Sequence, residues 1–174
     1  NEGRRPATVN TWMAGIKALF RWAVETKKLI YNPAENVKGA SRKGQTKKHT
    51  REALTDLEVR RVLSLPNRST AQGKRDAAIL SLMAYAGVRQ IEIHRADLVD
   101  LRTESGRLVL YVTGKGHTEA DDIVVIGNPK AENAIHDWLA DRGNHPGPLF
   151  TSFSDRSGGG RLGLRAIRGI VKEY

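Results

Sequence analysis

An arginine and a glutamate three residues apart form the most chemically informative pair in the sequence. Arg89 and Glu92 closely follow an apolar segment, residues 74–86, that is closed by Gly87. We expect Arg89, so close to a core segment, to be held away from water, where its charge needs an anionic partner. If that partner is Glu92, the two form a purely structural ion pair. The other candidate is a phosphate group, whose oxygens suit the planar guanidinium better than they suit a lysine ammonium.

Other kinds of chemical site find little support. The sequence has no Cys, and no two of its five His residues are three or four positions apart, so we expect no metal site. No P-loop and no Gly-x-Ser-x-Gly nucleophile motif occurs. Gly158, Gly160 and Gly163 match the glycine pattern of dinucleotide sites, but a polar segment separates them from the preceding strand. We interpret them as a surface loop and expect no cofactor.

Hydrophobic periodicity predicts the helices that position Arg89. Apolar residues recur at helical spacing over residues 8–27, and we expect the aromatic residues among them to be core residues. A capping box of Thr55 and Glu58 begins a second helix, which ends before Pro66. Residues 74–86 form a buried helix, with Gly87 in the left-handed conformation that ends many helices.

Two short strands and two further helices follow. Residues 108–113 and 122–126 are rich in Val and Ile and predict strands, joined by a polar hairpin. Asn128 and Pro129 open the next helix, and residues 162–172 form a last one. The order predicts a mainly α, α+β fold: a helical domain with a small antiparallel sheet.

Basic charge is concentrated at the start of the chain. The net charge is +10, and residues 1–51 hold 12 Lys and Arg against 3 Asp and Glu. Residues 38–51 contain no acid and no apolar period, which predicts an extended linker. Such a linker gains affinity for a phosphate backbone by releasing counterions, although a solvated tether would have the same composition. The candidate phosphate contacts are Lys38, Arg42, Lys43, Lys47, Lys48 and Arg51.

Residues 82–101 resemble the first arginine box of the tyrosine recombinase (phage integrase) family. Arg89 matches the family's first catalytic arginine, and Glu92 matches its supporting acid. Residues 112–116 resemble the hairpin that carries the catalytic lysine, which would be Lys115. Two positions depart from the pattern: Leu98 replaces the usual aromatic residue, and the hairpin tip is acidic after His117.

The resemblance extends over nearly the whole chain and implies three parts. Residues 1–38 would be the C-terminal part of a helical core-binding domain that clamps DNA. Residues 39–53 would be a basic interdomain linker, and residues 54–174 the N-terminal part of the catalytic domain. The family's second box, His-x-x-Arg, and the nucleophilic Tyr after it do not occur: no His is followed by Arg three residues later. We therefore expect a fragment that lacks its own nucleophile, a role that Tyr174 does not fill.

The implied activity is that of a site-specific DNA recombinase, or integrase, working through a phosphotyrosine intermediate. Arg89 would stabilise charge on the phosphoryl oxygens, Glu92 would orient Arg89, and Lys115 would protonate the departing 5′-oxygen. The implied partners are double-stranded DNA and, for the full-length protein, three further copies in a homo-tetramer on paired sites. No apolar run approaches the roughly 20 residues of a membrane span, so we expect a cytoplasmic, nucleoid-associated protein without a membrane partner.

Two alternatives remain open at the level of sequence. The first is a non-catalytic DNA-binding protein built on a recombinase-derived scaffold. The second is a basic RNA-binding or chromatin-like module, which accounts for the charge but not for the arginine box. In either the first alternative or the fragment interpretation, we expect this chain to bind DNA without cutting it.

Overall fold

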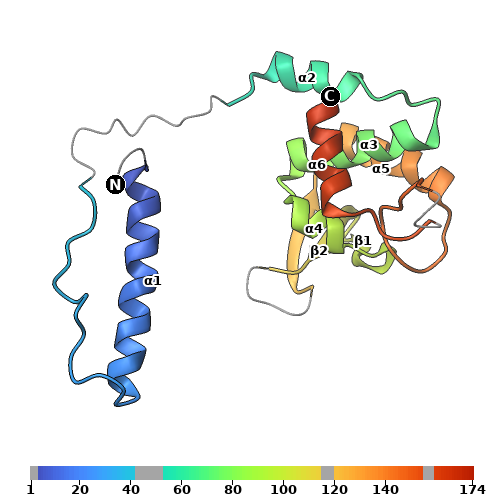
Figure 1. The fold of residues 1–174 in the computed structure, drawn as a ribbon. Coiled ribbons are helices and arrows are strands. Elements are labelled where there is room, and N and C mark those ends of the chain that lie inside the picture. The colour runs from blue at the N-terminus through green and yellow to red at the C-terminus, as the bar shows by residue number, and fades with distance from the viewer. Residues whose placement is uncertain (1–3, 42–52, 115–119, 155–158) are drawn as a thin grey trace. The chain divides into compact units, whose positions relative to one another are not determined.

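The computed structural model describes residues 4–41, 53–114, 120–154 and 159–174 (Figure 1). The chain divides into two compact units, Asn1–Glu52 and Ala53–Tyr174. In the part of the chain that the structure describes, no helix is both long and apolar enough to cross a membrane.

The first unit is one long helix with a segment folded back along it. Helix α1 (Pro6–Glu25) begins with a proline at its first position, where the missing N–H has no cost. Asn10 accepts a hydrogen bond from the Ala40 amide (2.7 Å) and donates one to its carbonyl (3.2 Å), which holds the returning segment against the helix. Within this unit Trp12 and Trp22 remain about half exposed, so the expected core position of these two aromatic residues is not reached here.

The second unit begins with the expected capping box. Helix α2 (Asp56–Ser64) starts after Thr55, whose hydroxyl oxygen accepts from the Glu58 amide. The Glu58 carboxylate accepts in return from the Thr55 amide at 2.8 Å, so two exposed backbone donors are satisfied. The helix ends before Pro66, as predicted.

The expected buried helix consists of two pieces. An α-helix, α3 (Ala71–Ser81), continues into a π-helical turn, η1 (Leu82–Ala86). Gly87 follows with φ of +68°, the left-handed conformation predicted for it. The short helix α4 (Gln90–Arg95) then begins directly after Arg89.

The sheet has three antiparallel strands in the order β1-β2-β3. The strands β2 (Arg107–Val112) and β3 (Asp122–Ile126) lie close to the predicted ranges. Strand β1 (Leu101–Glu104) was not predicted and follows the 3-10 turn η2 (Leu98–Asp100). It pairs with β2 from Leu101 opposite Leu110 to Glu104 opposite Arg107. Ser105 and Gly106 join the two strands with φ of +49° and +76°, the left-handed pair that a tight hairpin needs.

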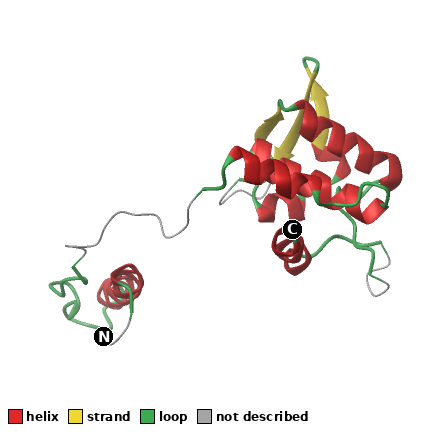
Figure 2. Cartoon of the chain, turned by 90° about the horizontal axis from the view of Figure 1, so that it is seen from above, coloured by secondary structure: helices red, strands yellow, loops and turns green. Residues whose placement is uncertain are grey.

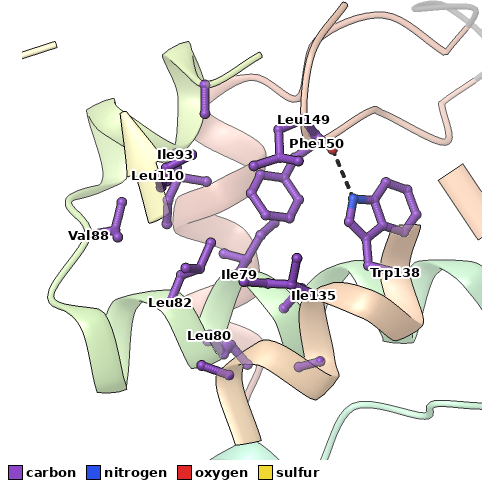
Figure 3. Packing of buried hydrophobic residues seen from close by; sticks show 14 of the residues in the cluster. Ile79, Leu80, Leu82, Val88, Ile93, Leu110, Ile135, Trp138, Leu149 and Phe150 are labelled. Carbon is purple, nitrogen blue, oxygen red and sulfur yellow. Dashed lines mark hydrogen bonds between the residues drawn. The ribbon is translucent and has the colours of Figure 1, made fainter. Parts of the chain in front are cut away.

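The core lies where α3, η1 and the sheet meet helix α5 (Pro129–Arg142) and helix α6 (Leu164–Glu173) (Figures 1 and 2). Figure 3 shows Ile79, Ile135 and Phe150 packed together beside Trp138, whose ring nitrogen donates to the Leu149 carbonyl at 2.9 Å. Trp138 is 1% exposed and Ile79 is fully buried. The predicted fold class, a mainly helical α+β domain with a small antiparallel sheet, is confirmed.

Candidate functional site

Glu92 holds Arg89 at two points. One Glu92 carboxylate oxygen accepts from the Arg89 backbone amide, and the other accepts from the guanidinium Nη1, both at 2.7 Å. The local fold makes this possible: Gly87 ends one helix, and α4 begins one residue after Arg89, so Glu92 lies one turn into α4. The carboxylate therefore fixes both the backbone and the side chain of Arg89.

The expectation that Arg89 is kept from water is wrong. The Arg89 side chain is 75% exposed, whereas the Glu92 side chain is 5% exposed. Within this pair the acid is therefore buried and the arginine side chain lies at the surface. Among the described residues no acceptor pairs with Nε or Nη2 of Arg89. A fixed guanidinium with two nitrogens open to solvent can bind an external anion.

Three side chains, Gln90, His94 and Arg161, join α4 to the segment around the start of α6. The side-chain amide of Gln90 donates to the Leu164 carbonyl, and His94 Nδ1 lies 2.8 Å from the Leu162 carbonyl oxygen. Because a carbonyl only accepts, Nδ1 of His94 must carry the proton. Arg161 Nη1 donates to the carbonyls of residues 94, 95 and 96, which satisfies the C-terminal end of α4.

Helix α6 carries a basic exposed side that sequence reasoning did not single out. Ile167 and Ile170 are buried, whereas Arg165, Arg168 and Lys172 are exposed. The Gln90–Leu164 contact brings the N-terminal ends of α4 and α6 together, so α6 begins beside the residue that follows Arg89. The three-and-four-residue spacing of these cations was the signal that could have identified them.

Of the other predicted site residues, Lys38 is among those that the structure describes. Its side chain is exposed in the first unit. Lys115 lies outside the described residues, and so do the remaining linker candidates, Arg42, Lys43, Lys47, Lys48 and Arg51. The structure therefore brings together Arg89 and Glu92 from the predicted set. The described ranges contain no group of three or more His, Asp or Glu side chains that could hold a metal ion.

A second arginine–carboxylate pair lies inside the same unit. Arg75 and Asp76 are 5% and 0% exposed, and Arg75 donates to Oδ1 of Asp76 at 2.7 and 2.9 Å. Arg75 also donates to the Thr151 carbonyl, and its guanidinium lies over the ring of Phe153. Oδ2 of Asp76 has no hydrogen-bond partner among the described residues. Burial raises the pKa of Asp76, against the opposing effect of Arg75.

Comparison with known proteins gives relatives over nearly the whole chain. The chain is 32% identical to a tyrosine recombinase of Synechococcus elongatus, over 99% of this chain and 52% of that protein. It is 33% identical to the tyrosine recombinase XerC of Myxococcus xanthus, over 97% of this chain and 55% of that protein. The chain thus spans about half the length of the curated relatives it matches. No family model matches it.

Two solved structures share the fold. The crystal structure of XerA recombinase matches with a TM-score of 0.51 and 21% identity, over 69% of this chain and 40% of that one. The integrase from mycobacterium phage Brujita matches with a TM-score of 0.50 and 21% identity, over 98% of this chain and 52% of that one. At this identity the two structures show the similarity of fold alone.

Proposed function

Because this chain belongs to the tyrosine recombinase family, we propose that the protein carrying it is a site-specific DNA recombinase that cuts and rejoins DNA through a phosphotyrosine intermediate. The observation that carries the proposal is the Arg89–Glu92 arrangement. A buried carboxylate fixes a guanidinium that is 75% exposed, at the position where the sequence resembles the family's arginine box.

The chemistry assigns one step to each residue. A tyrosine hydroxyl oxygen attacks the DNA phosphorus and forms a phosphotyrosyl bond, its proton passing to water, while the bond to the 5′-oxygen breaks. Negative charge grows on the two non-bridging phosphoryl oxygens, and Arg89 stabilises it through the nitrogens that Glu92 leaves open. Lys115 donates its proton to the departing 5′-oxygen, which leaves as a hydroxyl. Glu92 acts as a positioning residue because it contacts Arg89 and not the DNA.

Helix α6 extends this site toward the DNA backbone. Its start lies beside Gln90, the residue after Arg89, and its exposed Arg165, Arg168 and Lys172 form a basic side. Helix N-termini favour phosphate because their free amides and dipole are positive. We assign these three cations to phosphate contacts around the cleaved position.

The first unit and the linker complete the DNA contact. Residues 1–38 act as part of a core-binding domain, residues 39–53 as the linker, and residues 54–174 as part of the catalytic domain. Lys38 and the linker cations Arg42, Lys43, Lys47, Lys48 and Arg51 contact phosphates. We further propose that the complete protein works in the cytoplasm on nucleoid DNA, as a homo-tetramer on paired sites.

The 174-residue chain itself binds duplex DNA without cutting it, because it contains no His-x-x-Arg box. The same feature favours the alternative, a non-catalytic DNA-binding protein on this scaffold. The two functions differ when the complete protein is given DNA. A recombinase forms a covalent complex through one Tyr, whereas the alternative binds the DNA reversibly.

Substitution of Arg89 tests the catalytic assignment. In the complete protein, Arg89→Lys should lower formation of the covalent complex by roughly 100-fold or more, since it removes a bidentate donor to the developing charge. The affinity for duplex DNA should change little. Arg107→Lys, which changes an exposed arginine at the start of β2, is the matched control. Equal cleavage by the Arg89→Lys variant and the control would refute a catalytic role for Arg89.

A further inference from the structure

A basic hollow lies apart from Arg89, between helices α2 and α5. It has a volume of about 490 Å³ and is bordered by α2, the loop after it, the end of α3 with η1, and the first turn of α5. Its polar lining includes the cations Arg60, Arg68 and Lys130 and the neutral groups Ser81, Tyr85 and Asn133. No residue of α4 or α6 lines it. We call it the α2–α5 groove.

The charge of the α2–α5 groove is poorly balanced by the protein. Arg68 lies 3.7 Å from Asp137, at a site where both side chains are about half exposed, so that pairing is weak. Within the described part of the chain, the side chains of Arg60 and Lys130 have no ion-pair or hydrogen-bond partner. Asp56 lines only a smaller adjoining hollow, of about 210 Å³, together with Arg60 and Lys130. Cations that share one hollow repel each other unless an anion lies between them.

The backbone around the groove is held firmly. Asn67 accepts hydrogen bonds from the amide and hydroxyl of Ser69, and its carbonyl accepts from Thr70, so the loop carrying Arg68 is a closed turn. Gly73 packs against this turn so closely that a Cβ there would lie 1.9 Å from the Asn67 carbonyl oxygen. Asn128 caps the first turn of α5, which carries Lys130. A rigid frame lowers the entropy cost of binding a ligand.

We propose that the α2–α5 groove is a second anion site and that it takes a phosphate group. Two arginines, one lysine and neutral polar side chains suit the tetrahedral oxygens of phosphate, which accept hydrogen bonds from several directions. The amides of residues 130–132 already bond to Asn128, so side chains make the contacts. The phosphate can be a free anion or a diester of a nucleic-acid strand. The proposal does not depend on any role of Arg89.

A titration followed by NMR tests the site in the 174-residue chain carrying Arg89→Ala, which removes the other open guanidinium. The probes are inorganic phosphate, a single-stranded thymidine tetranucleotide, and hexaglutamate. The phosphate probes should shift the amide signals of residues around Arg60, Arg68 and Lys130. Stronger binding of the tetranucleotide identifies nucleic acid as the source, and stronger binding of inorganic phosphate identifies a small anion.

Matched variants separate the groove from general charge. The double variant Arg60→Gln/Lys130→Gln should weaken phosphate binding roughly tenfold. The control pair Arg61→Gln and Arg107→Gln removes the same charge at exposed positions outside the groove lining and should leave binding unchanged. The proposal would be overturned if both double variants lost phosphate affinity equally, or if phosphate shifted no amide signals at the groove. It would also be overturned if hexaglutamate bound there as strongly as the phosphate probes. Because Arg89 is absent throughout, these outcomes are independent of the recombinase proposal.

Discussion

Glu92 is the residue whose burial gives Arg89 a defined position at the surface. Its two oxygens bind the backbone and the guanidinium of Arg89 at 2.7 Å. In the complete protein, Glu92→Gln should lower DNA cleavage by about 10- to 100-fold, since a glutamine offers one acceptor oxygen and turns an NH2 group toward the other donor. Gel assays of covalent complex measure this effect.

The control for that variant is Glu132→Gln on α5. Both variants should bind duplex DNA with unchanged affinity, because neither side chain is assigned a DNA contact. If Glu92→Gln cleaved as well as Glu132→Gln, Glu92 would have no positioning role.

The buried Arg75–Asp76 pair should matter for stability. Removing either partner alone, by Arg75→Met or Asp76→Leu, should cost about 3–5 kcal/mol, because it leaves a buried charge without compensation. The double variant Arg75→Met/Asp76→Leu should lose much less unfolding free energy than the sum of the losses in the two single variants. Urea unfolding of the four proteins measures the coupling energy.

The neighbouring Lys74–Asp141 pair provides the comparison. Lys74 Nζ lies 2.9 Å from Oδ2 of Asp141, but the two side chains are 26% and 30% exposed. The same cycle there should give a coupling of about 0–1 kcal/mol, since water screens the pair. Similar coupling energies for both pairs would contradict the weight given to burial.

Asp76 also predicts a pH dependence of stability. Burial raises its pKa in the folded state, so the folded chain holds this proton to a higher pH than the unfolded chain does. Stability from this group is therefore full below the ordinary carboxyl pKa and is lost as pH rises through the raised value. Urea unfolding at several pH values should show this loss in the native chain and not in the Arg75→Met/Asp76→Leu variant. A parallel pH dependence in both would refute the assignment.

At the scale of elements, Gly87 controls the passage from η1 to α4. Its φ of +68° is strained for any residue with a Cβ, although no atom lies within 4 Å of the position that a Cβ would take. Gly87→Ala should therefore destabilise the chain by about 1 kcal/mol through backbone strain alone. Thermal unfolding measures the change.

Gly169 is the matched position within α6. It also has open space around a Cβ, but it lies inside a regular helix. Gly169→Ala should stabilise the chain by about 0.5–1 kcal/mol, because alanine loses less backbone entropy. If Gly87→Ala and Gly169→Ala destabilised the chain equally, φ would not determine whether alanine stabilises or destabilises a position.

At the scale of the whole molecule, the excess of positive charge predicts salt-dependent DNA binding. Replacing Lys47 and Lys48 with Gln should weaken binding to all duplex sequences and reduce the slope of log K against log salt by about 2, one unit for each lost phosphate contact. Fluorescence anisotropy at several salt concentrations measures the slope. An unchanged slope would mean that the linker is a tether without phosphate contacts.

Most of the helices and two of the three strands could be predicted because their signals are local. The capping box of Thr55 and Glu58, the left-handed Gly87 and the proline after Asn128 each act within a few residues. Strand β1 was missed because it is four residues long and is stabilised by pairing with β2. Its local signal was the Ser105-Gly106 turn, which indicates a tight hairpin.

The fold class and the family resemblance could be read from the sequence, which also offered Glu92 as one of two candidate partners of Arg89. The burial of Glu92 beside an exposed Arg89, the start of α6 beside Gln90, and the core position of Arg75 and Asp76 became evident from the folded structure. Burial and the contact of distant elements depend on which surfaces pack together. Spacing along a chain determines which side chains share a face, whereas packing determines whether that face meets water or protein.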